Sequence, residues 1–195
     1  MEVQLRSLYA SLKIPPSLPI EEWLTLGRTA ALTFLAKGEY WVRSGETSDS
    51  IGICIDGLFR IFYETPGGDE HNKSFCSRHD FIAPYGALLQ RIPSYLSIQS
   101  LQESQILVFR YEQLAASYDR HPGWERFGRI VAEQLFVKKE TRERELLLLT
   151  AEERYRLFLS QYGHLESEIP QYHIASYLGI TPVALSRIRR RINLG

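Results

Sequence analysis

Apolar positions along the chain follow two different spacings, and each predicts a different structure. Apolar residues at threes and fours predict short amphipathic helices over 3–12 and 20–26. In the middle of the chain, glycine-containing turns separate short runs rich in β-branched and aromatic residues. These runs predict strands at 51–55, 58–63, 97–101 and 105–110, with a hairpin loop at 66–69. Short strands at regular spacing favour a small antiparallel β-roll, or jelly roll.

A longer helical pattern follows the strands. Residues 123–149 contain no proline, and they carry apolar residues at helical spacing and later charged pairs such as Glu140 and Arg144. Thr150 and Glu153 have the spacing of a capping box, so a new helix is expected to begin at this point. A helix of about 40 Å is longer than one small roll can bury. Its apolar side predicts pairing with a second copy of the chain, although part of that side is expected to pack on the roll of its own subunit. The predicted dimer residues are Trp124, Phe127, Ile130 and Val131.

The last part of the chain has the pattern of a helix-turn-helix. Apolar spacing predicts a helix over 171–178, and Gly179 suits a tight turn that needs positive φ. Thr181 and Pro182 then suit the N-cap and the first position of a second helix, which runs to about Ile192. The preceding segment, 163–168, is brief, so any β-wing is expected to be vestigial.

The second of these helices has two chemically different faces. Leu185, Ile188 and Ile192 form an apolar stripe, whereas the opposite face is rich in arginine. Arginine can fork onto guanine and can neutralise phosphates, so this face is predicted to bind the major groove of DNA. A cationic helix end that only complements the helix dipole is the alternative. The predicted DNA-binding residues are Gln171, Thr181, Pro182, Val183, Ser186, Arg187, Arg189, Arg190 and Arg191.

Composition narrows the classes of function. Lys and Arg number 23 and are balanced by 23 Asp and Glu, so affinity for DNA must come from a local patch. Cys54 and Cys76 lack metal-type spacing, which suggests ordinary thiols in a reducing cytoplasm. No apolar run is long enough to cross a membrane. We predict no metal, cofactor or catalytic residue, because His71 and His79 lack further ligands at useful spacing. The alternative to a DNA-binding protein is a metal-dependent jelly-roll enzyme with a helical appendage.

Two stretches resemble the Crp/Fnr family of transcription factors. Residues 169–188 follow the family's C-terminal pattern Ile-x-x-x-x-Ile-Ala-x-x-Leu-Gly-Ile-Thr-x-x-x-Leu-Ser-Arg-Ile, and residues 37–63 are similar to its cyclic-nucleotide-binding β-roll. The resemblance implies an α+β fold and a homodimer on a palindromic double-stranded DNA operator, with RNA polymerase a further candidate partner. It implies a β-roll sensor domain at 1–120, a dimerisation helix at 121–149 and a (winged) helix-turn-helix domain at 150–195.

The chain departs from that family at the effector pocket. The family's phosphate-binding cassette carries Gly-Glu-Leu-Gly and then Arg-Ser or Arg-Thr, whose glutamate holds the ribose and whose arginine pairs with the cyclic phosphate. Proline offers no acceptor for a ribose hydroxyl and serine cannot neutralise a phosphodiester, so cyclic AMP is not expected to bind. Either another small-molecule effector uses the pocket, or the protein binds DNA constitutively. The residues at the matching positions are Ala83, Pro84, Tyr85, Gly86, Ser94 and Tyr95, with Arg91 nearby.

Overall fold

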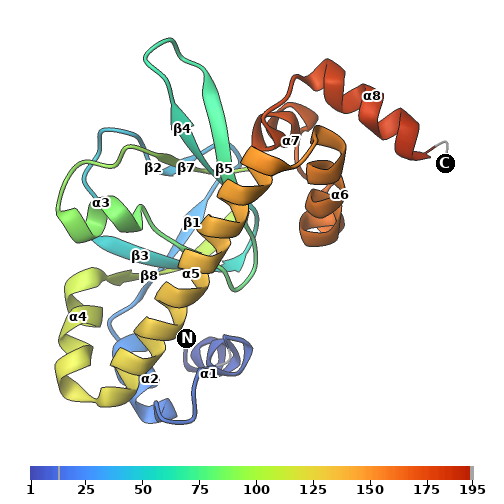
Figure 1. Cartoon of the computed structure of the whole chain (residues 1–195). Coiled ribbons are helices and arrows are strands. Elements are labelled where there is room, and N and C mark those ends of the chain that lie inside the picture. The colour runs from blue at the N-terminus through green and yellow to red at the C-terminus, as the bar shows by residue number, and fades with distance from the viewer. Residues whose placement is uncertain (13, 194–195) are drawn as a thin grey trace.

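The computed structural model of the chain describes residues 1–12 and 14–193. Two helices precede a β-roll, and a long helix joins the roll to a C-terminal helical domain (Figure 1). The capping box predicted for Thr150 is present: its Oγ1 accepts a hydrogen bond from the Glu153 amide at 3.3 Å, and the Glu153 carboxylate accepts from the Thr150 amide at 2.8 Å. The helices are α1 (Glu2–Ser11), α2 (Ile20–Gly27), α3 (Tyr85–Gln90), α4 (Tyr111–Arg120), α5 (Pro122–Leu148), α6 (Ala151–Tyr162), the 3-10 helix η1 (Gly163–Leu165), α7 (Gln171–Leu178) and α8 (Pro182–Asn193).

The roll consists of two four-stranded sheets, in the orders β1–β8–β3–β6 and β2–β7–β4–β5. All of the strand pairs are antiparallel, which confirms the predicted roll. Between β3 and β4, Gly57 has φ +116°, and a Cβ there would lie 2.1 Å from Ser104 Oγ, so the turn requires glycine. The strands are β1 (Ala31–Leu35), β2 (Tyr40–Val42), β3 (Ser50–Asp56), β4 (Phe59–Glu64), β5 (Glu70–Cys76), β6 (Phe81–Ile82), β7 (Ser97–Ser100) and β8 (Ser104–Arg110).

Apolar side chains form one core inside the roll and one on the outer face of each sheet. Ile61, Ile98 and Ile106 belong to the inner core. The outer face of the β3–β8 sheet is covered by α1, α2 and the first turns of α5, whose buried residues form a second core with Ile53, Leu107 and Phe109. The outer face of the β4–β5 sheet is covered by the C-terminal helices, so the third core joins the roll to the helix-turn-helix.

Trp124 and Phe127 do not lie on a free face of α5. Their side chains are 0 % and 6 % exposed, and the Trp124 ring stacks on Trp23 with the ring centroids 6.1 Å apart. Val131 packs at the edge of the same core, and Ile130 is half-buried. The prediction that Trp124 and Phe127 form an intersubunit seam is therefore wrong, because the first turns of α5 cover a sheet of their own subunit.

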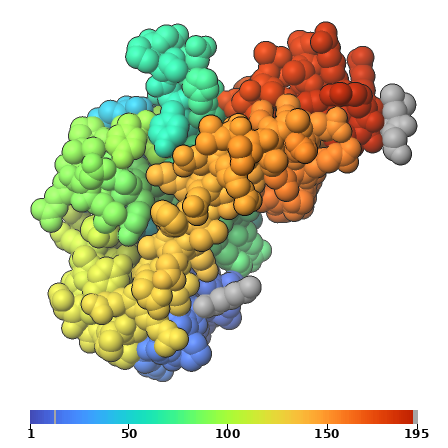
Figure 2. Space-filling view, in the orientation of Figure 1, coloured from blue at the N-terminus to red at the C-terminus, as the bar shows by residue number. Residues whose placement is uncertain are grey.

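The middle of α5 crosses the face of the molecule seen in Figure 2 with no other element over it. Residues 132–140 are all exposed. Large apolar side chains are exposed here and again at the end of the helix, where an isolated monomer gains nothing from them. These residues are Leu135, Phe136, Val137, Leu146, Leu147 and Leu148. No helix in the described residues is long and apolar enough to cross a membrane.

Candidate nucleic-acid interface and effector pocket

Helices α7 and α8 form the predicted helix-turn-helix. Helix α7 ends at Gly179, whose φ of +68° reverses the chain, and Thr181 Oγ1 then accepts a hydrogen bond from the Ala184 amide at 3.2 Å. Side chains of the two helices are buried in one core, so α7 and α8 form a rigid pair. The residues of α7 and α8 in this core are Ile174, Ala175, Tyr177, Leu178, Leu185 and Ile188. Between α6 and α7 the described residues form η1 and a turn, with no strand and hence no β-wing.

The face of α8 opposite this core is exposed. Arg187 and Arg190 lie on it, and neither forms an ion pair with any described residue. Val183 at the start of the helix is 62 % exposed. Thr181, Pro182 and Gln171 are also exposed, whereas Ser186 is half-buried. This surface therefore offers two uncompensated guanidinium groups beside small and apolar side chains.

Arg189 and Arg191 differ from the other two arginines of α8. Arg189 pairs with Glu166 at 3.3 Å, and Arg191 pairs with Glu152 at 3.6 Å. Glu166 also accepts a 2.6 Å hydrogen bond from the Tyr155 hydroxyl. Both of these arginines thus form ion pairs with acidic residues of the C-terminal helices and the turn between them. The predicted DNA-binding arginines therefore divide into two without an acidic partner among the described residues, Arg187 and Arg190, and two with one, Arg189 and Arg191.

The C-terminal end of α7 is held by two arginines from other helices. Arg142 of α5 donates to the Tyr177 carbonyl, and its guanidinium lies 3.9 Å from the centroid of the Tyr177 ring. Arg154 of α6 donates through Nε to the Leu178 carbonyl at 3.0 Å. Cations at this position satisfy carbonyls that have no partner in the helix. Sequence reasoning missed both contacts, because each joins residues far apart in the chain.

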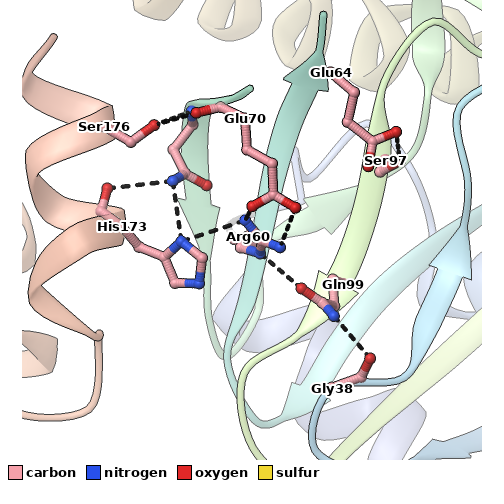
Figure 3. A network of polar contacts seen from close by, with 9 residues as sticks. Gly38, Arg60, Glu64, Glu70, Ser97, Gln99, His173 and Ser176 are labelled. Atoms are coloured by element: carbon pink, nitrogen blue, oxygen red, sulfur yellow. Dashed lines mark hydrogen bonds and ion pairs between the residues drawn. The ribbon is translucent and has the colours of Figure 1, made fainter. Parts of the chain in front are cut away.

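The other side of α7 contacts the β4–β5 sheet through a buried polar network (Figure 3). Arg60 of β4 is only 4 % exposed; its Nε donates to Gln99 Oε1 at 2.7 Å, and its NH1 and NH2 donate to Glu70. The same NH1 lies 3.3 Å from Nδ1 of His173 on α7. The guanidinium is therefore held on the sheet by two partners and reaches the helix with one nitrogen.

Asn72 and Ser176 complete the contact between β5 and α7. Asn72 Nδ2 lies 3.3 Å from His173 Nδ1 and donates to the His173 carbonyl, also at 3.3 Å. Ser176 Oγ accepts from the Asn72 amide at 2.9 Å and donates to the Glu70 carbonyl at 2.8 Å. The Ser176 hydroxyl thus forms hydrogen bonds with one backbone N–H and one backbone C=O of β5, which a neighbouring strand would otherwise bind.

His173 is neutral in this environment. Arg60 and Asn72 both direct N–H groups at Nδ1, so Nδ1 accepts and the proton resides on Nε2. Burial, and then the positive charge of Arg60, lower the pKa of His173 to about 4, although Glu70 acts in the opposite direction. A buried neutral histidine with two donors is a structural contact, and no metal ligand set surrounds it within the described residues.

The segment that corresponds to the phosphate-binding cassette contains no fixed cation. Ser94 is buried, and its Oγ donates to the Leu96 carbonyl at 2.7 Å and accepts from the Leu96 amide at 3.2 Å. Pro84 is buried directly before α3, where Ala83 and Tyr85 are half-buried. Arg91 ends α3 at φ +55° with an exposed side chain. The hydroxyl of Ser94 thus forms its hydrogen bonds within its own loop. Arg91 is the left-handed C-cap of α3, and its side chain is exposed to solvent.

Tyr95 lies over α3. A Cβ on Gly86 would be 2.9 Å from the Tyr95 hydroxyl, which accepts a hydrogen bond from Gln90 at 3.3 Å.

Cys54 and Cys76 are buried, and burial raises the pKa of each thiol to about 12, so neither is a reactive thiolate at neutral pH.

Comparisons with known proteins agree with this geometry. Residues 32–121 match the family model of the cyclic nucleotide-binding domain. FixK2 from Bradyrhizobium japonicum superimposes with a TM-score of 0.73 at 18% identity, over 85% of this chain and 85% of that chain. A CooA mutant from Carboxydothermus hydrogenoformans gives 0.71 at 15% identity, over 87% of this chain and 78% of that one. No curated protein sequence matches the chain.

A regulator described as belonging to the Crp/Fnr family, from Eubacterium rectale, is similar to the same extent. Its TM-score is 0.72 at 13% identity, over 91% of this chain and 84% of that chain. At these identities the likeness concerns the fold. The resemblance inferred from residues 37–63 and 169–188 is confirmed at that level. Residues 32–121 are therefore similar to the cyclic nucleotide-binding domain, and the chain has the fold of the Crp/Fnr transcriptional regulators.

Proposed function

We propose that this protein is a homodimeric, sequence-specific DNA-binding transcriptional regulator and not an enzyme. The observation that carries the proposal is the exposed face of α8, where Arg187 and Arg190 have no acidic partner among the described residues. Arginines on the second helix of a helix-turn-helix enter the major groove and fork onto guanine. The net charge of zero makes this local patch the source of affinity.

Dimerisation is supported by the exposed end of α5. Phe136 and Leu147 are 65 % and 75 % exposed and lie eleven residues apart, about three helical turns, on one side of the helix. Leu135 and Leu146 form a second column with the same spacing. A second copy of α5 would bury both columns in a two-helix seam. This seam replaces the one expected at Trp124 and Phe127.

The residues at the predicted effector pocket support the proposal that the protein binds an effector other than cyclic AMP, or no effector. An anionic phosphate held there would lose its hydration, and among the predicted pocket residues Arg91 alone is cationic. The exposed, left-handed position of Arg91 does not hold it in a pocket. Tyr95 lies across α3 in the same region. Constitutive DNA binding is the alternative within the same class of function.

Selection from a random duplex pool tests DNA binding, and the arginines of α8 provide matched variants. Arg187→Ala and Arg190→Ala are each expected to weaken binding to the selected palindrome by about 1–3 kcal/mol and to relax specificity. Arg189→Ala and Arg191→Ala are expected to cost less, because these side chains pair with Glu166 and Glu152. Equal losses of DNA affinity in all four variants would contradict the distinction between the two arginines that have acidic partners and the two that do not.

Light scattering on charge variants of α5 tests the seam. Phe136→Glu is expected to give monomers and to weaken operator binding by about tenfold or more, because two half-sites no longer act together. Gln134→Glu adds the same charge on the far side of the helix from Phe136 and should leave the dimer intact. A Phe136→Glu protein that stays dimeric would place the seam elsewhere.

Calorimetric titration of the dimer with cyclic AMP and cyclic GMP tests the pocket. We expect no binding in the micromolar range. Micromolar binding of either nucleotide, abolished by Arg91→Ala, would mean that Arg91 moves inward to pair with the phosphate.

A further inference from the structure

Helix α7 lies between the recognition helix and the sensor sheet. On one side it shares a buried core with α8, and on the other it contacts β4 and β5 (Figures 1 and 3). Because α7 and α8 form a rigid pair, any contact that fixes the orientation of α7 also fixes that of α8. The contact between α7 and the sheet is therefore able to set where the DNA-binding face points.

Apolar and polar contacts restrict this orientation differently. Phe75 of β5 packs against Phe158, Tyr162 and Tyr177, with ring centroids 5.5–6.3 Å apart. Such contact holds the domain on the sheet, but it is weakly directional. Hydrogen bonds, in contrast, weaken steeply when their angle changes.

The polar network provides that directional restraint. Gln99 and Glu70 hold the Arg60 guanidinium on the sheet, so its NH1 reaches His173 from a fixed position. One helical turn later, Ser176 binds both the Asn72 amide and the Glu70 carbonyl. Two anchor points about one turn apart define the rotation of α7 about its own axis and its angle to β5.

We propose that Arg60 and Ser176 are positioning residues that set the orientation of the recognition helix, and thereby the half-site spacing that the dimer accepts. The inference rests on the proposed DNA-binding function. In a two-fold dimer joined through α5, the separation of the two recognition helices depends on how each is oriented relative to its own sensor domain. Loss of the restraint broadens the accepted range of spacings and leaves the contacts of a single recognition helix with its half-site unchanged.

The experiment uses the full-length dimer and duplexes that carry the selected half-sites with spacers of different length. For the wild-type protein we expect one preferred spacer, with affinity about tenfold lower when the spacer is one base pair longer or shorter. In Arg60→Ala and in Ser176→Ala this preference falls to about threefold or less. Affinity for a duplex with one half-site changes by less than about twofold, because α8 is untouched.

Arg43→Ala is the matched control. Arg43 extends from the same sheet region and lies 3.6 Å from the centroid of the Tyr40 ring, and no hydrogen bond or ion pair joins its side chain to α7 among the described residues. It is expected to keep the wild-type spacer preference. Thermal unfolding and light scattering establish that each variant is folded and dimeric.

Each result decides the inference. A folded, dimeric Ser176→Ala protein with the wild-type spacer preference overturns it, whether or not Arg60→Ala folds. Equal broadening in Arg43→Ala also overturns it, because the effect would not depend on the contact with α7. A wild-type dimer that binds DNA without any spacer preference refutes the positioning role alone. Failure of the wild-type protein to select any duplex refutes the proposed function itself.

Discussion

The two sheets of the roll are covered on their outer faces in chemically different ways. On the β3–β8 sheet the covering is almost wholly apolar: the ring centroids of Phe109 and Trp124 each lie 6.1 Å from that of Trp23. On the β4–β5 sheet, Phe75 lies beside a buried cluster of Arg60, Asn72 and His173. One face carries the N-terminal helices and the start of α5, and the other carries the helix-turn-helix.

This difference indicates what each interface does. Burial of apolar area is strongly stabilising and tolerates small shifts, so the first face attaches α5 to the roll. A buried charged network contributes less net stability, because its desolvation offsets much of the attraction, but it specifies geometry. Asn72 Oδ1 even lacks a partner within the described residues. The second face therefore determines orientation more than it adds stability.

The largest effect is expected on the apolar face. Trp124→Ala removes a fully buried ring and should lower the free energy of unfolding by about 3–5 kcal/mol. Urea unfolding followed by circular dichroism measures this loss. Phe34→Ala is the control, because Phe34 is 70 % exposed on β1 and should change stability by less than about 0.5 kcal/mol. Similar losses in the two variants would contradict the packing of α5 on this sheet.

An intermediate effect is expected from the charge state of His173. Its pKa of about 4 lies below the usual value of 6.5, so between these values the unfolded chain binds one more proton than the folded one. Stability therefore falls as the pH is lowered, by about 2 kcal/mol between pH 7 and 5. The hydrogen bond from Arg60 holds the pKa of Glu70 below 4.5, so Glu70 contributes little in this window.

Variants isolate the histidine contribution. His173→Gln should remove most of this slope in urea unfolding at pH 5, 6 and 7. His164→Gln should leave it unchanged, because His164 is exposed on η1. A slope that persists in His173→Gln would assign it to another group.

The smallest effect is expected from Asn72→Leu. This change loses two 3.3 Å hydrogen bonds to His173, but it also removes a buried carbonyl oxygen that has no partner. The two contributions nearly cancel, so stability should change by less than about 1 kcal/mol. A loss of 3 kcal/mol or more, on the scale of about two unsatisfied buried groups, would show that the amide is essential to the interface.

Periodicity was sufficient for most of the elements. The helix predicted over 123–149 is α5 (Pro122–Leu148), and the capping box at Thr150 begins α6 as predicted. The turn at Gly179 and the N-cap at Thr181 also lie where their residue types placed them. These features depend on neighbouring residues only, so the local sequence contains the information that specifies them.

Strand β5 gave no such signal. Its sequence, Glu-His-Asn-Lys-Ser-Phe-Cys, has few apolar residues and no clear alternation, because Glu70, Asn72 and Ser74 occur where β-branched residues are usual. The side chain of Asn72 contacts His173 of α7, and backbone groups of Glu70 and Asn72 contact Ser176, in each case across more than a hundred positions of sequence. The buried polar side chain of Asn72 is therefore explained by its contact with α7, whereas His71 and Lys73 of the same strand are exposed to solvent.

The sequence by itself determined most of the helices, four of the eight strands that the structure describes, and the helix-turn-helix. Each of these follows from residue type and short-range spacing. Only the tertiary structure decided that Trp124 faces its own sheet, that Arg189 and Arg191 pair with Glu166 and Glu152, and that His173 meets Arg60. An apolar or charged side chain specifies that it needs a partner, but the partner is chosen by which surfaces the folded chain brings together.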